Sequence, residues 1–546
     1  MKMKTFFQKI KKKKYILFLL LILIIFIGSY FRLYNLNQTP PGLENKEASL
    51  GLEALKISEK NHDLSSFFRK ENWSNFYSII LAFPLNTPNI NIFSLRLVSA
   101  VFSILTLIGF SLLLLSLNFS KLSTLLGVFL LSTSFWHLNF SRIVDEAILM
   151  PFFIVWFIYL FILGIQKNSF LLFVLSGFFL GLSFYFSLKF CLLFLILFIL
   201  LLFFIFFKEE FIKKFWKKLI VFVVAFILII APLIYFFYQN PEILENKKQI
   251  LSSINYNKFS DNILLHLNAF YFKGDTNQKH NHAGTPLIPS TWAILFTIGF
   301  ALTIKEILFC ALHRKNKSFL DPLFKISILS QAVFWIMLLP GILIEKNLPD
   351  SSKIVGTIPA IIIFILIPFE YILRLRENLQ KSPNLKFKPW RWRILNTALS
   401  GLILLVSLSG ILNTYTYFFV WNNEIKTVET YQKKLVDFGK IIKEQTPAKN
   451  KLAIISNKIN PNKNHRDNTL KTAEFVGYPE SKLFQFQNSS EALENLKKDS
   501  QCQNNLYLFF EANKQLIEKF KTICPNFQTE KQKPLNGYYE FWVLKN

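Results

Sequence analysis

The chain leaves its first long apolar run in FRLYNLNQTPPGLENKEASLGLEALKISE, residues 31–59. This stretch begins with basic and aromatic residues and then reaches Pro40, Pro41 and Gly42. These three residues cannot continue a helix, so they predict a turn. The residues from about 44 to 59 predict an amphipathic helix, because polar residues recur there at spacings of three and four.

The predicted helix has a polar stripe and a less polar face. Glu44 and Glu47 fall on the less polar face, where a carboxylate near a membrane is costly unless it has a function or a partner. They are therefore candidate catalytic residues, although acidic residues in a first helical turn also suit the helix dipole. Lys46 lies on the polar stripe, together with Ser49, Glu53, Lys56 and Lys60.

The composition indicates a polytopic α-helical membrane protein. The chain has 546 residues, of which 52% are hydrophobic, and most apolar residues lie in long runs. A bilayer core is crossed by about 20 apolar residues in a helix. The net charge of +28 comes from Lys and Arg that cluster in short loops between these runs. This clustering is the positive-inside pattern of membrane proteins, and the basic loops would be attracted to anionic lipid headgroups. The positive charge is thereby explained, so nucleic acid is not an expected partner.

We expect about eleven membrane spans, with the basic residues 1–14 in the cytoplasm. The first span lacks a small-residue cleavage site after it and is therefore expected to remain as an anchor. The expected cytoplasmic loops contain Lys121, Lys167 and the ranges 208–218, 313–317 and 374–393. The long connections 31–92 and 239–290, the shorter 341–353 and the tail then lie on the opposite side. The expected spans are 15–30, 94–117, 122–137, 147–165, 170–186, 190–207, 219–238, 291–312, 323–340, 354–374 and 394–415.

The tail, residues 416–546, predicts a small α/β domain outside the cytoplasm. Strand-like runs occur at Leu452–Ser456, Leu506–Phe510 and Tyr538–Leu544, with helical patterns at 490–498 and 513–522 between them. Cys502 and Cys524 are the two cysteines of this tail, and an oxidising compartment would permit a disulfide between them. Cys191 and Cys310 lie in apolar runs and are expected to be packing residues.

Further polar motifs fall on the expected non-cytoplasmic side of the spans. Each motif alone also fits a structural role, as an ion pair, an interfacial anchor or a snorkelling cation. His280 and His282 could bind a divalent metal ion with Asp275, although a single His-x-His pair is a weak signal. The motifs contain Arg142, Asp145 and Glu146; Tyr185 and Lys189; Asp275, Asn277, Lys279, His280, Asn281 and His282; and Lys353.

Carboxylates and cations at a membrane surface fit the transfer of a sugar from a lipid-linked phosphate. The phosphate leaving group needs positive charge. The acceptor hydroxyl needs a carboxylate base within hydrogen-bond reach. The lipid tail would lie in a groove between apolar helices.

Over about residues 25–415 the chain resembles the bacterial family 39 glycosyltransferases. These belong to the GT-C superfamily, with the protein O-mannosyltransferases and the aminoarabinose transferase ArnT as relatives. The resemblance is carried by four segments in order: PPGLENKEASLGLEAL, FWHLNFSRIVDEAILMPFF, GDTNQKHNHAGTPLIP and LLPGILIEKNLPDSSKIVGTIPA.

The resemblance implies a GT-C fold and a membrane glycosyltransferase. Such an enzyme moves a sugar from a polyprenyl-phosphate donor to a glycan, lipid or protein hydroxyl outside the cytoplasm. The family's catalytic Asp falls on Lys46, and Glu47 matches the acidic residue that follows it. The base is then Glu47 or Glu44, or Asp145 carries more of the role, or the protein is an inactive homologue. A lipid-linked-sugar flippase or transporter is the alternative from another class.

The remaining roles follow from residue type. Arg142, Lys189, Lys279 and Lys353 would bind the donor phosphate, where Lys353 replaces the usual Arg and lacks its bidentate fork. The expected substrate-binding residues are Tyr185, Asp275, Asn277, His280 and Asn281.

Overall fold

A computed structural model gives the structure of most of the chain. It describes all residues except 1, 60–75, 88–89, 208–210, 243–257, 313–321, 344–347, 382–388, 445–450, 456–469, 499–504, 511–513, 535–536 and 546. The expected basic loop 313–317 and Cys502 therefore lie outside the described residues. The chain divides into two compact units, which we describe separately. Unit 1 contains residues 1–34, 67–77 and 99–421, and unit 2 contains residues 35–66, 78–98 and 422–546.

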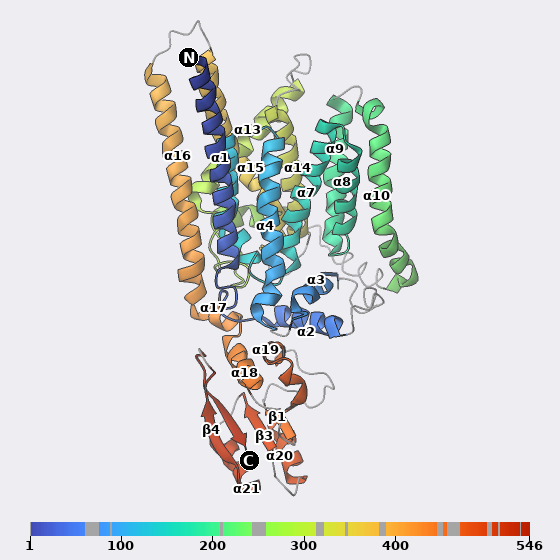
Figure 1. Ribbon diagram of the computed structural model, residues 1–546, viewed down its shortest axis with the longest axis vertical. Coiled ribbons are helices and arrows are strands. Elements are labelled where there is room, and N and C mark those ends of the chain that lie inside the picture. Colours follow the sequence, from blue (N-terminus) through green and yellow to red (C-terminus); the bar gives the residue numbers. More distant parts are fainter. Residues whose placement is uncertain are drawn as a thin grey trace. The chain divides into compact units, whose positions relative to one another are not determined.

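Unit 1 is a bundle of long apolar helices (Figure 1). In a bilayer every backbone polar group must be satisfied within the protein, and an apolar helix achieves this along its own length. The main helices of the bundle are α1 (Lys2–Leu33), α4 (Ile92–Ser116), α5 (Lys121–Thr133), α7 (Leu149–Lys167), α8 (Phe170–Ser183), α9 (Leu192–Phe207), α10 (Phe211–Gln239), α13 (Ser290–Leu312), α14 (Pro322–Ile342), α15 (Ile358–Lys381) and α16 (Pro389–Tyr415).

Shorter elements connect these helices. They are α6 (Phe135–Phe140), α12 (Phe259–Tyr271), the 3-10 turns η2 (Glu146–Ile148), η3 (Leu188–Cys191) and η6 (Val355–Thr357), and the π-helical turn η7 (Thr416–Val420), which leads into the 3-10 turn η8 (Trp421–Asn423). The motifs at 135–151, 272–289 and 340–359 lie on or beside these short elements.

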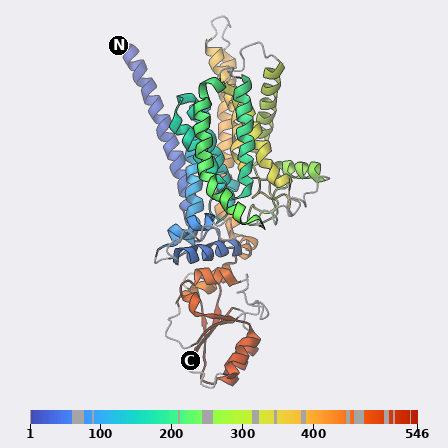
Figure 2. The ribbon, with the colours of Figure 1, turned by 90° about the vertical axis from the view of Figure 1, so that its right-hand side faces the viewer.

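Eight helical segments among the described residues are long and apolar enough to cross a membrane. Eight of the eleven expected spans fall on these segments, and the expected spans 122–137, 170–186 and 190–207 fall on shorter apolar helices. The long helices of unit 1 extend roughly along one common direction (Figure 2). The prediction of a polytopic α-helical membrane protein is confirmed.

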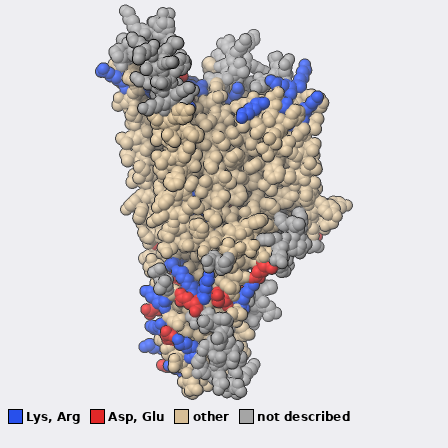
Figure 3. Space-filling view, viewed as in Figure 1, with Lys and Arg blue, Asp and Glu red and all other residues tan. Residues whose placement is uncertain are grey.

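Burial differs strongly between the helices of unit 1. In the most apolar stretch of Val355–Glu377, a segment that contains most of α15, 89% of the residues are buried. In the corresponding stretch of Tyr15–Leu33 in α1, only 11% of the residues are buried. Thus α15 is a central helix of the bundle, and α1 presents most of its apolar surface outward. Figure 3 shows a broad band of the bundle that is almost free of charged side chains, with Lys and Arg gathered at one end. This distribution suits a bilayer around the band.

Unit 2 begins with the polar stretch after α1. The expected helix is α2 (Asn45–Glu59), and it is followed by α3 (Phe76–Leu85), most of which belongs to unit 2. The first residues of α4, up to Val98, also belong to unit 2. The predicted orientation of α2 is confirmed, because Lys46 is exposed and Glu47 is fully buried.

The tail of unit 2 is the predicted α/β domain. Its five-stranded sheet has the order β2-β1-β3-β5-β4, with β1 parallel to β2 and β3, and β5 antiparallel to β3 and β4. The strands are β1 (Lys451–Ile455), β2 (Gln485–Gln487), β3 (Asn505–Phe509), β4 (Gln528–Gln532) and β5 (Phe541–Lys545). The other elements are α17 (Ile425–Thr430), α18 (Lys433–Glu444), α19 (Lys471–Val476), η10 (Glu480–Leu483), α20 (Ser489–Lys498) and α21 (Lys514–Ile523).

Both faces of this sheet are buried. Leu506 and Leu508 of β3 pack in one apolar cluster with Phe438 of α18. Tyr507 and Phe509, the alternate residues of the same strand, pack in a second cluster with residues of α20 and α21. The alternation follows from the two-residue period of a strand. Cys524, which directly follows α21, is disulfide-bonded, whereas Cys191 and Cys310 are not part of a disulfide.

Candidate functional site

Glu44 and Glu47 form the N-terminal cap of α2. The Glu44 carboxylate accepts a hydrogen bond from the Lys46 backbone N–H at 2.9 Å. The Glu47 carboxylate reaches back and accepts from the Glu44 backbone N–H at 3.2 Å. This reciprocal arrangement is a capping box with glutamate at both positions, and negative charge there also suits the helix dipole.

Glu47 is also one half of a buried ion pair with Arg96 of α4. The Arg96 Nη2 lies 2.9 Å from Glu47 Oε2, its Nε lies 3.2 Å from Oε1, and both side chains are fully buried. The rest of the guanidinium donates to backbone carbonyls of the preceding turn, at Leu36, Pro40 and Gly42. Arg96 therefore holds the predicted turn and the start of α2 together.

The segment around Gly42, between the turn and α2, also contacts residues of the tail, which belong to the same unit 2. The Leu43 N–H donates to the Tyr431 carbonyl at 2.7 Å, and the buried Thr472 hydroxyl lies 3.1 Å from the Leu43 carbonyl. At Gly42 a Cβ atom would lie 2.1 Å from the Tyr431 carbonyl oxygen, so only glycine permits this approach. The Arg96 guanidinium also lies over the Tyr431 ring, 5.9 Å from its centroid.

In unit 1, Asp275 joins two of the expected motifs. Its Oδ2 accepts hydrogen bonds from the backbone N–H and the hydroxyl of Ser351, each at 2.8 Å. Its Oδ1 accepts from the Asn277 N–H at 2.8 Å, which closes a local turn. The loop after α12 is thereby tied to the loop before η6, although the two residues are 76 positions apart.

His280 and Asp350 complete a charged cluster around Asp275. The His280 Nδ1 lies 3.3 Å from Asp275 Oδ2 and 3.5 Å from Asp350 Oδ1. Burial opposes charging of the imidazole, but the hydrogen bonds that it donates to the carboxylates of Asp275 and Asp350, together with the charges of Asp275 and Asp145, outweigh burial and raise the pKa of His280 to about 9. Asp145 therefore lies within electrostatic reach of this cluster.

Asp350 is stabilised in its charged form. Burial would raise its pKa, but hydrogen bonds with His280 and Ser352 and the charge of Lys353 outweigh burial and hold the pKa of the Asp350 carboxyl well below its usual range. The Lys353 Nζ lies 3.0 Å from Asp350 Oδ2, and both side chains are 15% exposed. Thus Lys353, an expected phosphate ligand, shares the partner Asp350 with His280 and keeps some access to solvent.

One atom from each of Asp275, His280 and Asp350 lies within 4.8 Å of the others, which is close enough for a shared metal ion. Two carboxylates and one imidazole are a donor set that divalent metals accept. This group differs from the expected one, because Asp350 takes the place that was expected for His282. His282 lines another pocket, beside Asn281 and residues of α16.

Arg142 and Asp145 flank the turn that precedes α7. The Arg142 guanidinium is fully buried and donates to the backbone carbonyls of Phe31 and Tyr34, each at 2.6 Å. The Asp145 Oδ1 caps η2 by accepting from the Ala147 N–H at 3.0 Å. These contacts give Arg142 a role in holding the end of α1; its role as a phosphate ligand stays a prediction.

The other expected residues occupy separate positions. Lys279 is 8% exposed, and its carbonyl accepts from the Asn139 amide at 2.8 Å. Asn281 donates to the Thr285 carbonyl at 2.7 Å and so shapes the loop. The Tyr185 hydroxyl donates to the Ile229 carbonyl of α10 at 2.7 Å. Lys189 lies half-buried on η3.

Arg96, Asp350 and Ser351 were not among the functional residues predicted from the sequence. Arg96 is a lone charge at the start of an apolar run, which is a recognisable signal for a buried partner. Asp350 and Ser351 stand within a segment that carried the family resemblance, beside Lys353. Their residue types alone did not reveal that they meet Asp275.

Comparison with family models gives a match over residues 76–235, to the dolichyl-phosphate-mannose-protein mannosyltransferase family. A comparison of the sequence with curated proteins finds no match. Among solved structures, ArnT from Cupriavidus metallidurans in the apo state is similar with a TM-score of 0.46 and 13% identity, covering 96% of this chain and 97% of that chain. The same protein bound to undecaprenyl phosphate gives a TM-score of 0.45 and 11% identity, with the same coverage.

The expected resemblance is confirmed at the level of the superfamily, because the family whose model matches is one of the GT-C glycosyltransferases. This segment contains Arg142, Asp145, Tyr185 and Lys189. The chain is thus a multi-pass membrane protein whose residues 76–235 match the model of a glycosyltransferase family.

Proposed function

We propose that this protein is a membrane glycosyltransferase that moves a sugar from a polyprenyl-phosphate donor to an acceptor hydroxyl. The observation that carries the proposal is the charged cluster of Asp275, His280, Asp350 and Lys353, with Asp145 in electrostatic reach. The cluster lies on loops next to membrane helices. The phosphate of a lipid carrier would lie at the membrane surface, where loops of this kind leave the membrane helices. The matched family is named for a dolichyl-phosphate sugar, which is a donor of this class.

The proposed reaction is a single displacement at the anomeric carbon. The acceptor oxygen forms a bond to this carbon while the bond from the carbon to the phosphate oxygen breaks. The acceptor proton goes to a carboxylate base, and polyprenyl phosphate leaves with the bonding electron pair. Lys353 and Lys279 supply positive charge for the phosphate, which gains negative charge as it leaves.

We assign the base to Asp145. Of the three carboxylates expected for this role, Glu44 and Glu47 cap α2, and Glu47 is also paired with Arg96. Asp145 lies in the same unit as the charged cluster, and its charge acts on His280. If His280 gives up its proton, Asp275, His280 and Asp350 would hold a divalent metal ion, which would add positive charge beside the phosphate.

The test is sugar transfer by the purified full-length protein and its Asp145→Asn variant. Loss of a general base costs about 100-fold or more in turnover, so the variant should lose nearly all transfer. Asp261→Asn is the matched control, because Asp261 is an exposed residue of α12 in the same unit. Binding of the lipid-linked sugar should persist in both variants.

Two results would contradict the assignment. Turnover of Asp145→Asn at the wild-type rate would exclude Asp145 as the base. Binding without transfer by the wild-type protein, with every sugar donor and acceptor tested, would show an inactive homologue instead.

A further inference from the structure

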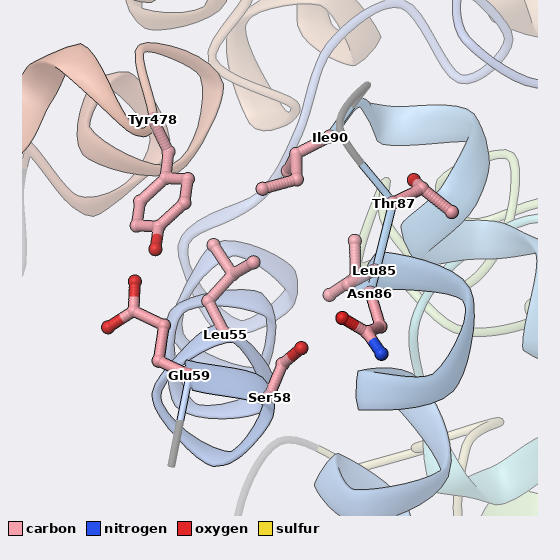
Figure 4. A pocket seen from close by; sticks show the side chains of 8 residues that line it. All are labelled: Leu55, Ser58, Glu59, Leu85, Asn86, Thr87, Ile90 and Tyr478. Carbon is pink, nitrogen blue, oxygen red and sulfur yellow. The ribbon is translucent and has the colours of Figure 1, made fainter. Parts of the chain in front are cut away.

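Unit 2 contains a pocket that the proposed reaction does not use (Figure 4). Its volume is about 310 Å³, which is near the lower end of small-molecule sites. The walls come from the end of α2, the end of α3 with the segment after it, and Tyr478, two residues before η10. The lining residues are Leu55, Ser58, Glu59, Leu85, Asn86, Thr87, Ile90 and Tyr478.

The pocket combines apolar and polar walls. Leu55, Leu85 and Ile90 supply aliphatic surface in its middle. On one side the Tyr478 hydroxyl and the Glu59 carboxylate point toward each other, and on the other side lie the Ser58 hydroxyl and the Asn86 amide (Figure 4). Hydrogen-bonding groups therefore stand on two opposite edges of an apolar surface.

Three of the polar side chains that line the pocket are not used by the fold. Within the described part of the chain, the side chains of Ser58, Asn86 and Thr87 make no hydrogen bond. Ser49, on the same helix as Ser58, shows the usual alternative, since its hydroxyl donates to the Asn45 carbonyl at 2.7 Å. Uncommitted donors and acceptors around one cavity are characteristic of a binding site.

The charges at the pocket are balanced. Lys482 forms an ion pair with Glu59 and also lies over the Tyr478 ring, 4.9 Å from its centroid. Because this pair is neutral overall, the pocket offers no excess charge to an ionic ligand. The Glu59 carboxylate still has lone pairs that can accept from a ligand hydroxyl.

We propose that this pocket binds one uncharged pyranose ring of a glycan. A sugar ring has an apolar face of C–H groups and an edge of hydroxyl groups that both donate and accept hydrogen bonds. The aliphatic middle of the pocket matches the face. Glu59 and Tyr478 match hydroxyls on one side, and Ser58 and Asn86 match them on the other. The inference goes beyond the proposed function, because binding here requires no sugar transfer.

The test is saturation-transfer NMR on the full-length protein in lipid nanodiscs. Maltoside detergents are avoided because their sugar headgroups would compete for the pocket. The probes are the methyl glycosides of glucose, galactose, mannose and N-acetylglucosamine, with glucose 6-phosphate as a charged comparison. The variant Asn86→Trp fills the pocket from an exposed position, and Asn526→Trp, at an exposed asparagine outside it, is the matched control.

At least one uncharged glycoside should give a signal with the wild-type protein and with Asn526→Trp but not with Asn86→Trp. Its affinity should fall about two- to tenfold in Asn86→Ala, the usual effect of one lost hydrogen bond. The proposal is wrong if no uncharged glycoside gives a signal, or if the signal persists in Asn86→Trp. A signal from glucose 6-phosphate alone would also overturn it.

Discussion

Replacing Glu47 with Gln distinguishes a structural carboxylate from a catalytic one. The substitution keeps the shape of the side chain but leaves the fully buried Arg96 charge without its counter-charge. Breaking a buried ion pair from one side costs about 3–5 kcal/mol. At about 2–4 °C per kcal/mol for a unit of this size, Glu47→Gln should lower the melting temperature by roughly 6–20 °C.

The double variant Glu47→Gln/Arg96→Met sharpens this test. It removes both charges, so it should recover much of the stability lost in Glu47→Gln, which is a coupling of the two residues in a double-mutant cycle. The measurements are thermal unfolding and sugar transfer on the same samples. If Glu47→Gln melts like the wild type but transfers no sugar, Glu47 is the base and our structural reasoning is refuted.

Further predictions concern both units and the topology. Thr472→Val should destabilise unit 2 by about 1 kcal/mol, because it removes the buried hydroxyl near the Leu43 carbonyl; an unchanged melting curve would exclude that hydrogen bond. Lys353→Ala should weaken binding of the lipid-linked sugar about tenfold or more, the scale of a lost charge-assisted hydrogen bond, whereas Lys121→Ala at an expected cytoplasmic loop should not. Equal effects of both changes would count against a phosphate site at Lys353. A reporter fused after Asn546 should work only outside the cytoplasm, and cytoplasmic activity would overturn the expected topology.

Local patterns in the sequence predicted most of the elements. The long apolar runs fall on helices, and the wheel geometry of α2 placed Lys46 outward and Glu47 inward, as observed. In the tail, the runs at 452–456 and 506–510 coincide with β1 and β3. β4 was missed because its sequence, QTEKQ, is polar and only its pairing with β5 defines it.

The candidate site was predicted only in part, because its residues meet through tertiary contacts. The sequence pattern selected Asp275, His280 and Lys353 separately, but their grouping depends on Asp350 and Ser351, about 75 positions away from Asp275. The role of Glu47 could not be inferred without its partner Arg96, which lies 49 positions further along the chain. Such separations leave no periodic signal in a sequence.

The proposal is tested most directly by transfer of a labelled sugar from polyprenyl-phosphate mannose or glucose. The assay uses purified full-length protein in nanodiscs with a membrane extract as the source of acceptors, and it measures released polyprenyl phosphate together with labelled product. We expect both products in equal amounts with the wild-type protein and with Asp261→Asn, and at least about 100-fold less with Asp145→Asn. Binding of the lipid-linked sugar with no release of polyprenyl phosphate by the wild-type protein would contradict the proposed function.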